Sequence, residues 1–76
     1  VNGEKRQSSN TDHLIHSVAE IIAELTRGIT LRAGTIIATG TPAGVGMGFT
    51  PPQFLKKGDV VTCEIEGIGA LTNTVE

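Results

Sequence analysis

The apolar residues between positions 14 and 25 recur at a helical spacing. Counted from Leu14, the others fall at offsets of 1, 4, 7, 8 and 11 residues, namely Ile15, Val18, Ile21, Ile22 and Leu25. This spacing places them on one face of an α-helix. Asn10 or Thr11 offers the side-chain oxygen that caps a helix start, and Gly28 offers a stop. The pattern predicts one amphipathic helix whose apolar face packs against a core.

Other stretches have the pattern of strands. Residues 35–39 form a short apolar and β-branched run between two glycines, which is typical of a buried strand. Residues 60–66 alternate, with Val61, Cys63 and Ile65 on one face. A glycine-flanked turn then leads to a last strand at 70–75, and the polar residues 4–8 are expected to form a short strand. One helix and about four strands, mostly antiparallel, predict an α+β fold.

The dipeptide Asn2-Gly3 is a strong hairpin signal, because a type I′ turn needs positive φ at both central residues. Only Val1 precedes it. We therefore expect residues 1–76 to be a single segment, the C-terminal piece of a longer protein.

Composition narrows the possible partners. The chain has 76 residues, six Lys and Arg against eight Asp and Glu, and no basic block, which argues against a nucleic acid or an anionic membrane as partner. No apolar run reaches the length of a membrane span, and the first residues do not resemble a signal peptide. A single cysteine, Cys63, fits a reducing compartment, and we expect a cytoplasmic protein.

A glycine-rich loop is the segment whose residues are best suited to bind a ligand. It covers residues 41–52 and follows the predicted strand that ends at Thr39. Its glycines and those beside it permit close backbone approach to a ligand, and the hydroxyls of Thr39 and Thr41 add donors suited to an anionic oxygen. A plain connecting loop is the alternative. A P-loop and a dinucleotide fingerprint are excluded, because no Lys-Ser/Thr pair follows and the third glycine is missing.

Several short motifs, in this order and spacing, together resemble the C-terminal part of the fumarylacetoacetate hydrolase family. They span essentially the whole chain: Val1-Asn2-Gly3-Glu4 with Gln7 and Thr11, Leu31 to Gly34, Thr39 to Gly46, Phe54-Leu55 with Gly58-Asp59, and Ile65 to Gly69. One departure is Gly34-Thr35, where the family usually has Gly-Asp.

The resemblance implies a mixed β-sandwich roll, present here as a partial domain, and a divalent cation, Mg²⁺ or Mn²⁺, held by three carboxylates upstream of this segment. It also implies that Thr41 contacts a metal-chelated 2-oxo acid substrate, with Gly40 and Pro42 shaping that contact. No catalytic residue and no metal ligand is expected within the 76 residues. A homodimer is expected.

Two polar clusters mimic metal sites. Glu64 and Glu66 lie on one strand face, about 7 Å apart by strand rise, but we interpret them as a solvated or partner-facing part of the strand. His13 and His16, with Asp12 and Glu20 nearby, have a spacing that permits metal ligation. They fall opposite the apolar stripe, so a solvated helix face is the preferred interpretation.

Two apolar features have simpler interpretations. Cys63 alternates with Val61 and Ile65, which indicates a small core residue rather than a nucleophile. Phe54-Leu55 is either a plug on the core or a subunit contact.

The resulting hypothesis is a segment of a metal-dependent enzyme that acts on a small 2-oxo or 2,4-dioxo acid. Hydrolytic carbon–carbon cleavage is the first expectation. Isomerisation, tautomerisation or decarboxylation of a hydroxymuconate-type diacid or oxaloacetate is the alternative within the family. A third possibility is a non-catalytic fragment that needs the rest of its protein or a dimer mate. We expect the 76 residues alone to be inactive.

Overall fold

A computed structural model describes all 76 residues and contains one α-helix and one two-stranded antiparallel sheet. The chain divides into two compact units, one made of Val1–Ser8 and Thr41–Glu76, and one made of Ser9–Gly40. The combination of a helix with antiparallel strands is as predicted. Of the four or so expected strands, those at 4–8 and 35–39 are absent, and no sandwich roll is seen.

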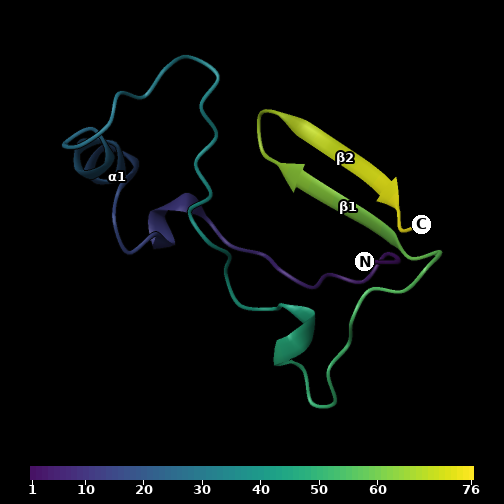
Figure 1. The fold of residues 1–76 in the computed structure, drawn as a ribbon. Coiled ribbons are helices and arrows are strands. Elements are labelled where there is room, and N and C mark those ends of the chain that lie inside the picture. Colours follow the sequence, from purple (N-terminus) through teal and green to yellow (C-terminus); the bar gives the residue numbers. More distant parts are fainter. The chain divides into compact units, whose positions relative to one another are not determined.

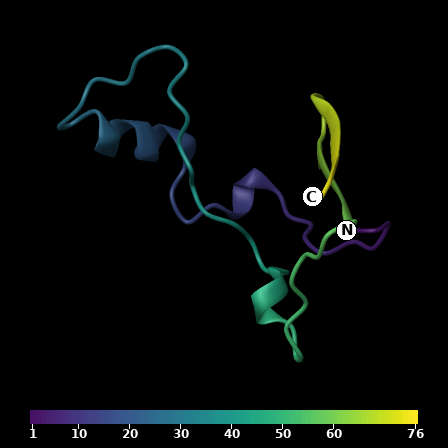
Figure 2. The ribbon, with the colours of Figure 1, turned by 45° about the vertical axis from the view of Figure 1, so that its right-hand side comes forward.

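The unit Ser9–Gly40 contains a 3₁₀ helix, η1 (Thr11–His13), and the α-helix α1 (Val18–Leu25), which Figure 2 shows from the side. Asn10 caps η1, not α1, because its side chain accepts from the Asp12 N–H. The cap of α1 is Ser17, whose hydroxyl accepts from the Glu20 N–H at 3.2 Å and donates to the Glu20 carboxylate at 3.1 Å. Ser17 and Glu20 have the Ser-x-x-Glu spacing of a capping box, and the Ser17 cap starts α1 later than predicted.

The rest of this unit departs further from the sequence-based expectation. The α-helix ends at Leu25, before Gly28, and Leu14 and Ile15 precede it. No side chain of the apolar stripe is buried, so its predicted core position is not seen in this chain. The strand predicted at 35–39 is absent, and Ile36 is 93% exposed. An apolar, β-branched run favours extended backbone, but a strand also needs a neighbouring strand to pair with.

The other unit contains the hairpin of β1 (Val60–Ile65) and β2 (Gly69–Thr74), drawn as two adjacent arrows in Figure 1. Val60 pairs with Thr74 at one end and Ile65 with Gly69 at the other. Both predicted strands are therefore confirmed, each one residue shorter or shifted at an end. Cys63 lies in β1 and is exposed, so the prediction that it is a core residue is wrong for this chain.

Residues 4–8 form no strand, but the turn before them is the one that the sequence predicts. Asn2 and Gly3 have φ angles of 51° and 79°, and the Glu4 N–H donates to the Val1 carbonyl at 2.9 Å. Residues 41–52 form a loop interrupted by one 3₁₀ helix, η2 (Gly46–Gly48). Because residues 1–8 and this loop belong to the same unit, side chains far apart in sequence meet there.

Candidate functional site

The Gln7 side chain connects the N-terminal segment to the start of the glycine-rich loop. Its amide nitrogen Nε2 donates to the Thr41 hydroxyl at 2.7 Å and to the Pro42 carbonyl at 2.9 Å. Thr41 and Pro42 are exposed. Two of the three residues that the sequence analysis assigned to substrate binding are thus held by one side chain 34 residues away from Thr41.

Gly40 immediately precedes this pair and has a φ of +98°, a value that side-chain-bearing residues rarely adopt. A Cβ atom at this position would meet no atom within 4 Å. The positive φ, rather than a close contact within this chain, is what favours glycine at position 40.

The next two glycines serve a different purpose from the one predicted. A Cβ atom at Gly44 would lie 1.9 Å from the Arg6 carbonyl oxygen, and one at Gly46 would lie 2.2 Å from the Gln53 carbonyl oxygen. Real Cβ atoms do not approach so closely. Gly44 and Gly46 therefore let the loop pack against the protein's own backbone, which supports the connecting-loop interpretation for this part of the loop.

Arg6 forms a second set of contacts with the loop region. Its guanidinium lies 5.0 Å from the centre of the Phe49 ring and donates to the Gln53 side-chain oxygen. The Arg6 side chain is 21% exposed, and its Nε has no hydrogen-bond partner. A cation over an aromatic face is an attractive arrangement. Arg6 thus fastens residues 1–8 to the loop, a role that the sequence analysis did not assign to it.

Asn2 and Asp59 join the first turn to the start of β1. Asn2 Nδ2 donates to Asp59 Oδ1 at 3.0 Å, and Asn2 Oδ1 accepts from the Val60 N–H at 2.8 Å. Asp59 Oδ2 also accepts from the Lys56 N–H at 2.8 Å. The hydrogen bond from Asn2, followed by that from the Lys56 backbone, lowers the pKa of Asp59 below its ordinary value.

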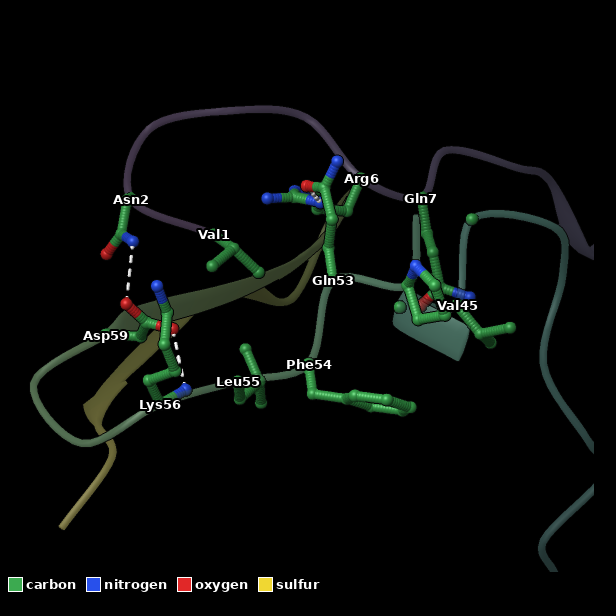
Figure 3. Close-up of a pocket in the computed structure, with 13 residues that line it drawn as sticks. Val1, Asn2, Arg6, Gln7, Val45, Gln53, Phe54, Leu55, Lys56 and Asp59 are labelled. Atoms are coloured by element: carbon green, nitrogen blue, oxygen red, sulfur yellow. Dashed lines mark hydrogen bonds between the residues drawn. The ribbon is translucent and has the colours of Figure 1, made fainter. Parts of the chain in front are cut away.

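A pocket of about 740 Å³ lies among these segments of the unit. Figure 3 shows Arg6 and Gln53 on one side of it and Phe54 and Leu55 on another. Gln7 lines the pocket, but none of the three predicted substrate-binding residues does. Phe54 and Leu55 are 64% and 53% exposed, so neither forms a plug on a core within this chain.

The two clusters that mimic metal sites are exposed. His16 pairs with Glu20 at 3.4 Å and His13 with Asp12 at 3.5 Å, and all four side chains are well exposed, as expected. The two histidines do not lie on the α-helix, however, because His13 belongs to η1 and His16 precedes α1. Glu64 and Glu66 are also exposed. No three His, Cys, Asp or Glu side chains are placed to hold a metal ion. The residues present thus do not form the divalent-cation site that the resemblance implies.

The helices of this structure include none with the length and apolar character that crossing a membrane requires.

Comparison with known proteins identifies the family. The family described as fumarylacetoacetate (FAA) hydrolase C-terminal matches residues 1–76. The chain is 55% identical over 75 residues to oxaloacetate tautomerase YisK of Bacillus subtilis (strain 168). The matched residues make up 99% of this chain and 25% of that protein.

Two further relatives agree with this match over 99% of the chain. Oxaloacetate tautomerase Fahd2a, mitochondrial, of Rattus norvegicus is 52% identical, and an uncharacterized protein of Staphylococcus saprophyticus is 49% identical. The chain spans about a quarter of the length of the curated relatives it matches. Since the family match covers every residue, the chain belongs to the fumarylacetoacetate hydrolase family and corresponds to its C-terminal region.

Proposed function

We propose that this chain is a segment of an enzyme that interconverts the keto and enol forms of oxaloacetate. The observation that carries the proposal is the identity of 52–55%, over 99% of the chain, to relatives named oxaloacetate tautomerases. This favours tautomerisation over the hydrolytic cleavage that was the first expectation from the sequence.

Thr41 is the residue of this segment that we place at the substrate. Its hydroxyl is exposed and held by Gln7, and the backbone beside it is open at Gly40. A hydroxyl here suits an oxygen of a 2-oxo acid, which carries negative charge on its carboxylate and gains more at the keto oxygen as an enolate forms. Gly40 and Pro42 shape the approach to that hydroxyl.

The proton transfers of the reaction are not assigned to this segment. Enolisation moves a proton away from the carbon next to the keto group, which needs a positioned base. Neither histidine is near Thr41 in sequence, and both pair with exposed carboxylates. We therefore propose that the base, and the ligands of the Mg²⁺ or Mn²⁺ ion, come from residues outside 1–76. A homodimer and a cytoplasmic location are further parts of this proposal.

Hydrolysis of a 2,4-dioxo acid is the second candidate, because the matching family is described as a hydrolase. Both reactions pass through an enolate, so Thr41 would meet the same kind of oxygen in each.

The test is a substrate panel with the full-length protein and added Mg²⁺. Enol oxaloacetate is followed by its ultraviolet absorbance, and acylpyruvates are followed by loss of the diketone absorbance with release of pyruvate. Faster keto–enol conversion than in a heat-denatured control, with no acylpyruvate cleavage, is the expected result. Cleavage of an acylpyruvate without any effect on oxaloacetate would replace the proposal by the hydrolase.

A further inference from the structure

The orientation of the Gln7 amide is fixed by the group it faces. Pro42 has no N–H, and its carbonyl oxygen only accepts hydrogen bonds. The Gln7 atom 2.9 Å from that oxygen must therefore be the amide nitrogen, because the amide oxygen would place two acceptors against each other. The same nitrogen lies 2.7 Å from the Thr41 hydroxyl oxygen.

This orientation determines what the Thr41 hydroxyl can do. A primary amide nitrogen has two hydrogens, so one reaches Pro42 and the other reaches Thr41, whose oxygen acts as the acceptor. A hydroxyl that accepts through a lone pair keeps its own proton to donate elsewhere. No acceptor within the chain is hydrogen-bonded to that proton. The Thr41 hydroxyl is thus held as an outward donor.

We propose that Gln7 is a positioning residue that sets the Thr41 hydroxyl as a hydrogen-bond donor to an anionic oxygen of the substrate. The inference rests on the proposed function of Thr41. Gln7 need not touch the substrate; it acts by orienting Thr41 and by fixing the Pro42 carbonyl beside it. Without the Gln7 amide, the Thr41 hydroxyl would rotate freely. If a carboxylate replaced the amide, the hydroxyl would donate its proton to that carboxylate.

The test compares four full-length proteins: wild type, Gln7→Glu, Thr41→Val and the double variant. Glutamate matches glutamine in size but, when ionised, only accepts hydrogen bonds, so it captures the Thr41 proton. We expect Gln7→Glu to lower kcat/KM by about ten- to hundredfold and to divide that loss between kcat and KM as Thr41→Val does. In the Thr41→Val background, Gln7→Glu should lower kcat/KM by less than about threefold, because the hydroxyl that the glutamate would capture is absent.

A second variant separates positioning from a structural link. Gln7→Met removes both hydrogen bonds at similar size but leaves the Thr41 hydroxyl able to donate. Gln7→Met should lower the unfolding midpoint no more than Gln7→Glu does, and it should keep more activity than Gln7→Glu. Losses that multiply in the double variant, or equal activity of Gln7→Met and Gln7→Glu, would show a merely structural link and overturn the inference.

The assay uses whichever 2-oxo acid of the panel the wild type converts. Failure with oxaloacetate alone contradicts the proposed reaction and leaves the inference standing on the other substrate. Full activity of Thr41→Val contradicts the role of Thr41 and overturns the inference with it. A loss in Thr41→Val without a loss in Gln7→Glu overturns the inference alone.

Discussion

Asn2 and Asp59, 57 residues apart in sequence, are joined by a hydrogen bond of 3.0 Å from the Asn2 amide to the Asp59 carboxylate. The Asn2 backbone N–H also donates to the Val60 carbonyl at 2.8 Å, and the Asn2 side-chain oxygen accepts from the Val60 N–H. One residue with positive φ thus connects the first turn of the chain to the start of β1.

Replacing Asn2 should destabilise the full-length protein in a defined order. Asn2→Gly keeps the left-handed backbone but loses the side-chain bonds, whereas Asn2→Ala also introduces backbone strain. Left-handed backbone strain costs a non-glycine residue roughly 1–2 kcal/mol, and glycine's greater unfolded-state entropy offsets about 0.5–1 kcal/mol. Alanine should therefore be the more destabilising by up to about 1.5 kcal/mol. Denaturant midpoints measure the order. Asn73→Ala, on exposed β2, is the control and should change little.

The same contact predicts a pH dependence. The pKa of Asp59 lies below its ordinary value of 3.8 because of the Asn2 and Lys56 hydrogen bonds. A depressed pKa stabilises the fold above the ordinary value, and that contribution is lost as the pH falls through the lowered one. The stability difference between wild type and Asn2→Ala should therefore shrink on acidification below 3.8. An NMR titration in which the pKa of Asp59 does not rise in Asn2→Ala would contradict this.

Thr41→Val in the full-length protein tests the proposed substrate contact. It keeps the β-branched shape and removes the hydroxyl, so the free energy of unfolding should fall by at most about 0.5–1.5 kcal/mol, the contribution of the lost hydrogen bond from Gln7. Losing a hydrogen bond to a charged group costs about 1.5–3 kcal/mol, which at roughly 1.4 kcal/mol per tenfold predicts about a ten- to hundredfold lower kcat/KM. The loss appears in KM if the contact is uniform and in kcat if it tightens in the transition state.

Thr74→Val, on β2 and with no side-chain hydrogen bond, is the matched control for Thr41→Val and should keep full activity. Unchanged kcat/KM in Thr41→Val would mean that the start of the loop only connects its neighbouring segments and does not bind substrate.

Two glycines of η2 form a matched pair for stability. A Cβ at Gly46 would lie 2.2 Å from the Gln53 carbonyl oxygen, whereas one at Gly48 would make an ordinary contact at 3.6 Å with the Val45 side chain. Neither has positive φ. We expect Gly46→Ala to destabilise by about 1–3 kcal/mol, the range for overpacking, and Gly48→Ala to be nearly neutral. Equal thermal midpoints of the two variants would show that the loop does not pack on Gln53 in the full-length protein.

The capping box predicts a local effect on α1. Ser17→Ala removes the side-chain cap, which costs about 0.5–2 kcal/mol, so the amides of α1 should exchange hydrogen about 2- to 30-fold faster. Ser8→Ala, which removes an exposed hydroxyl that forms no hydrogen bond within the chain, is the control. Unaltered exchange in Ser17→Ala would mean that other contacts hold the helix start.

Local patterns predicted the elements that depend on local interactions. The alternation at 60–66 and the glycine-flanked turn after it correspond to β1 and β2, and the Asn2-Gly3 turn has the expected backbone. The start of α1 was also encoded, as the Ser-x-x-Glu motif of Ser17 and Glu20, but the apolar spacing favoured an earlier start. The capping motif, which the prediction of Asn10 or Thr11 as cap overlooked, marks the boundary that periodicity misplaced.

Contacts between residues far apart in the sequence could not be predicted from local patterns. The strand expected at 35–39 needs a partner strand that local pattern does not specify. Arg6 and Gln53 lie 47 residues apart, and Gln7 and Thr41 lie 34 apart. The resemblance identified Thr41 as a candidate, but only the folded chain shows that Gln7 holds it and that Gly44 and Gly46 face backbone.

The hairpin of β1 and β2 has a consequence for handling the protein. β2 has β1 as its single neighbour, so the outward row of N–H and C=O groups from Gly69 to Thr74 is unpaired. This strand contains no charged residue and no proline, the residues that usually discourage strand addition. In concentrated solution the isolated 76-residue chain is therefore expected to aggregate through β2, and light scattering should rise with protein concentration.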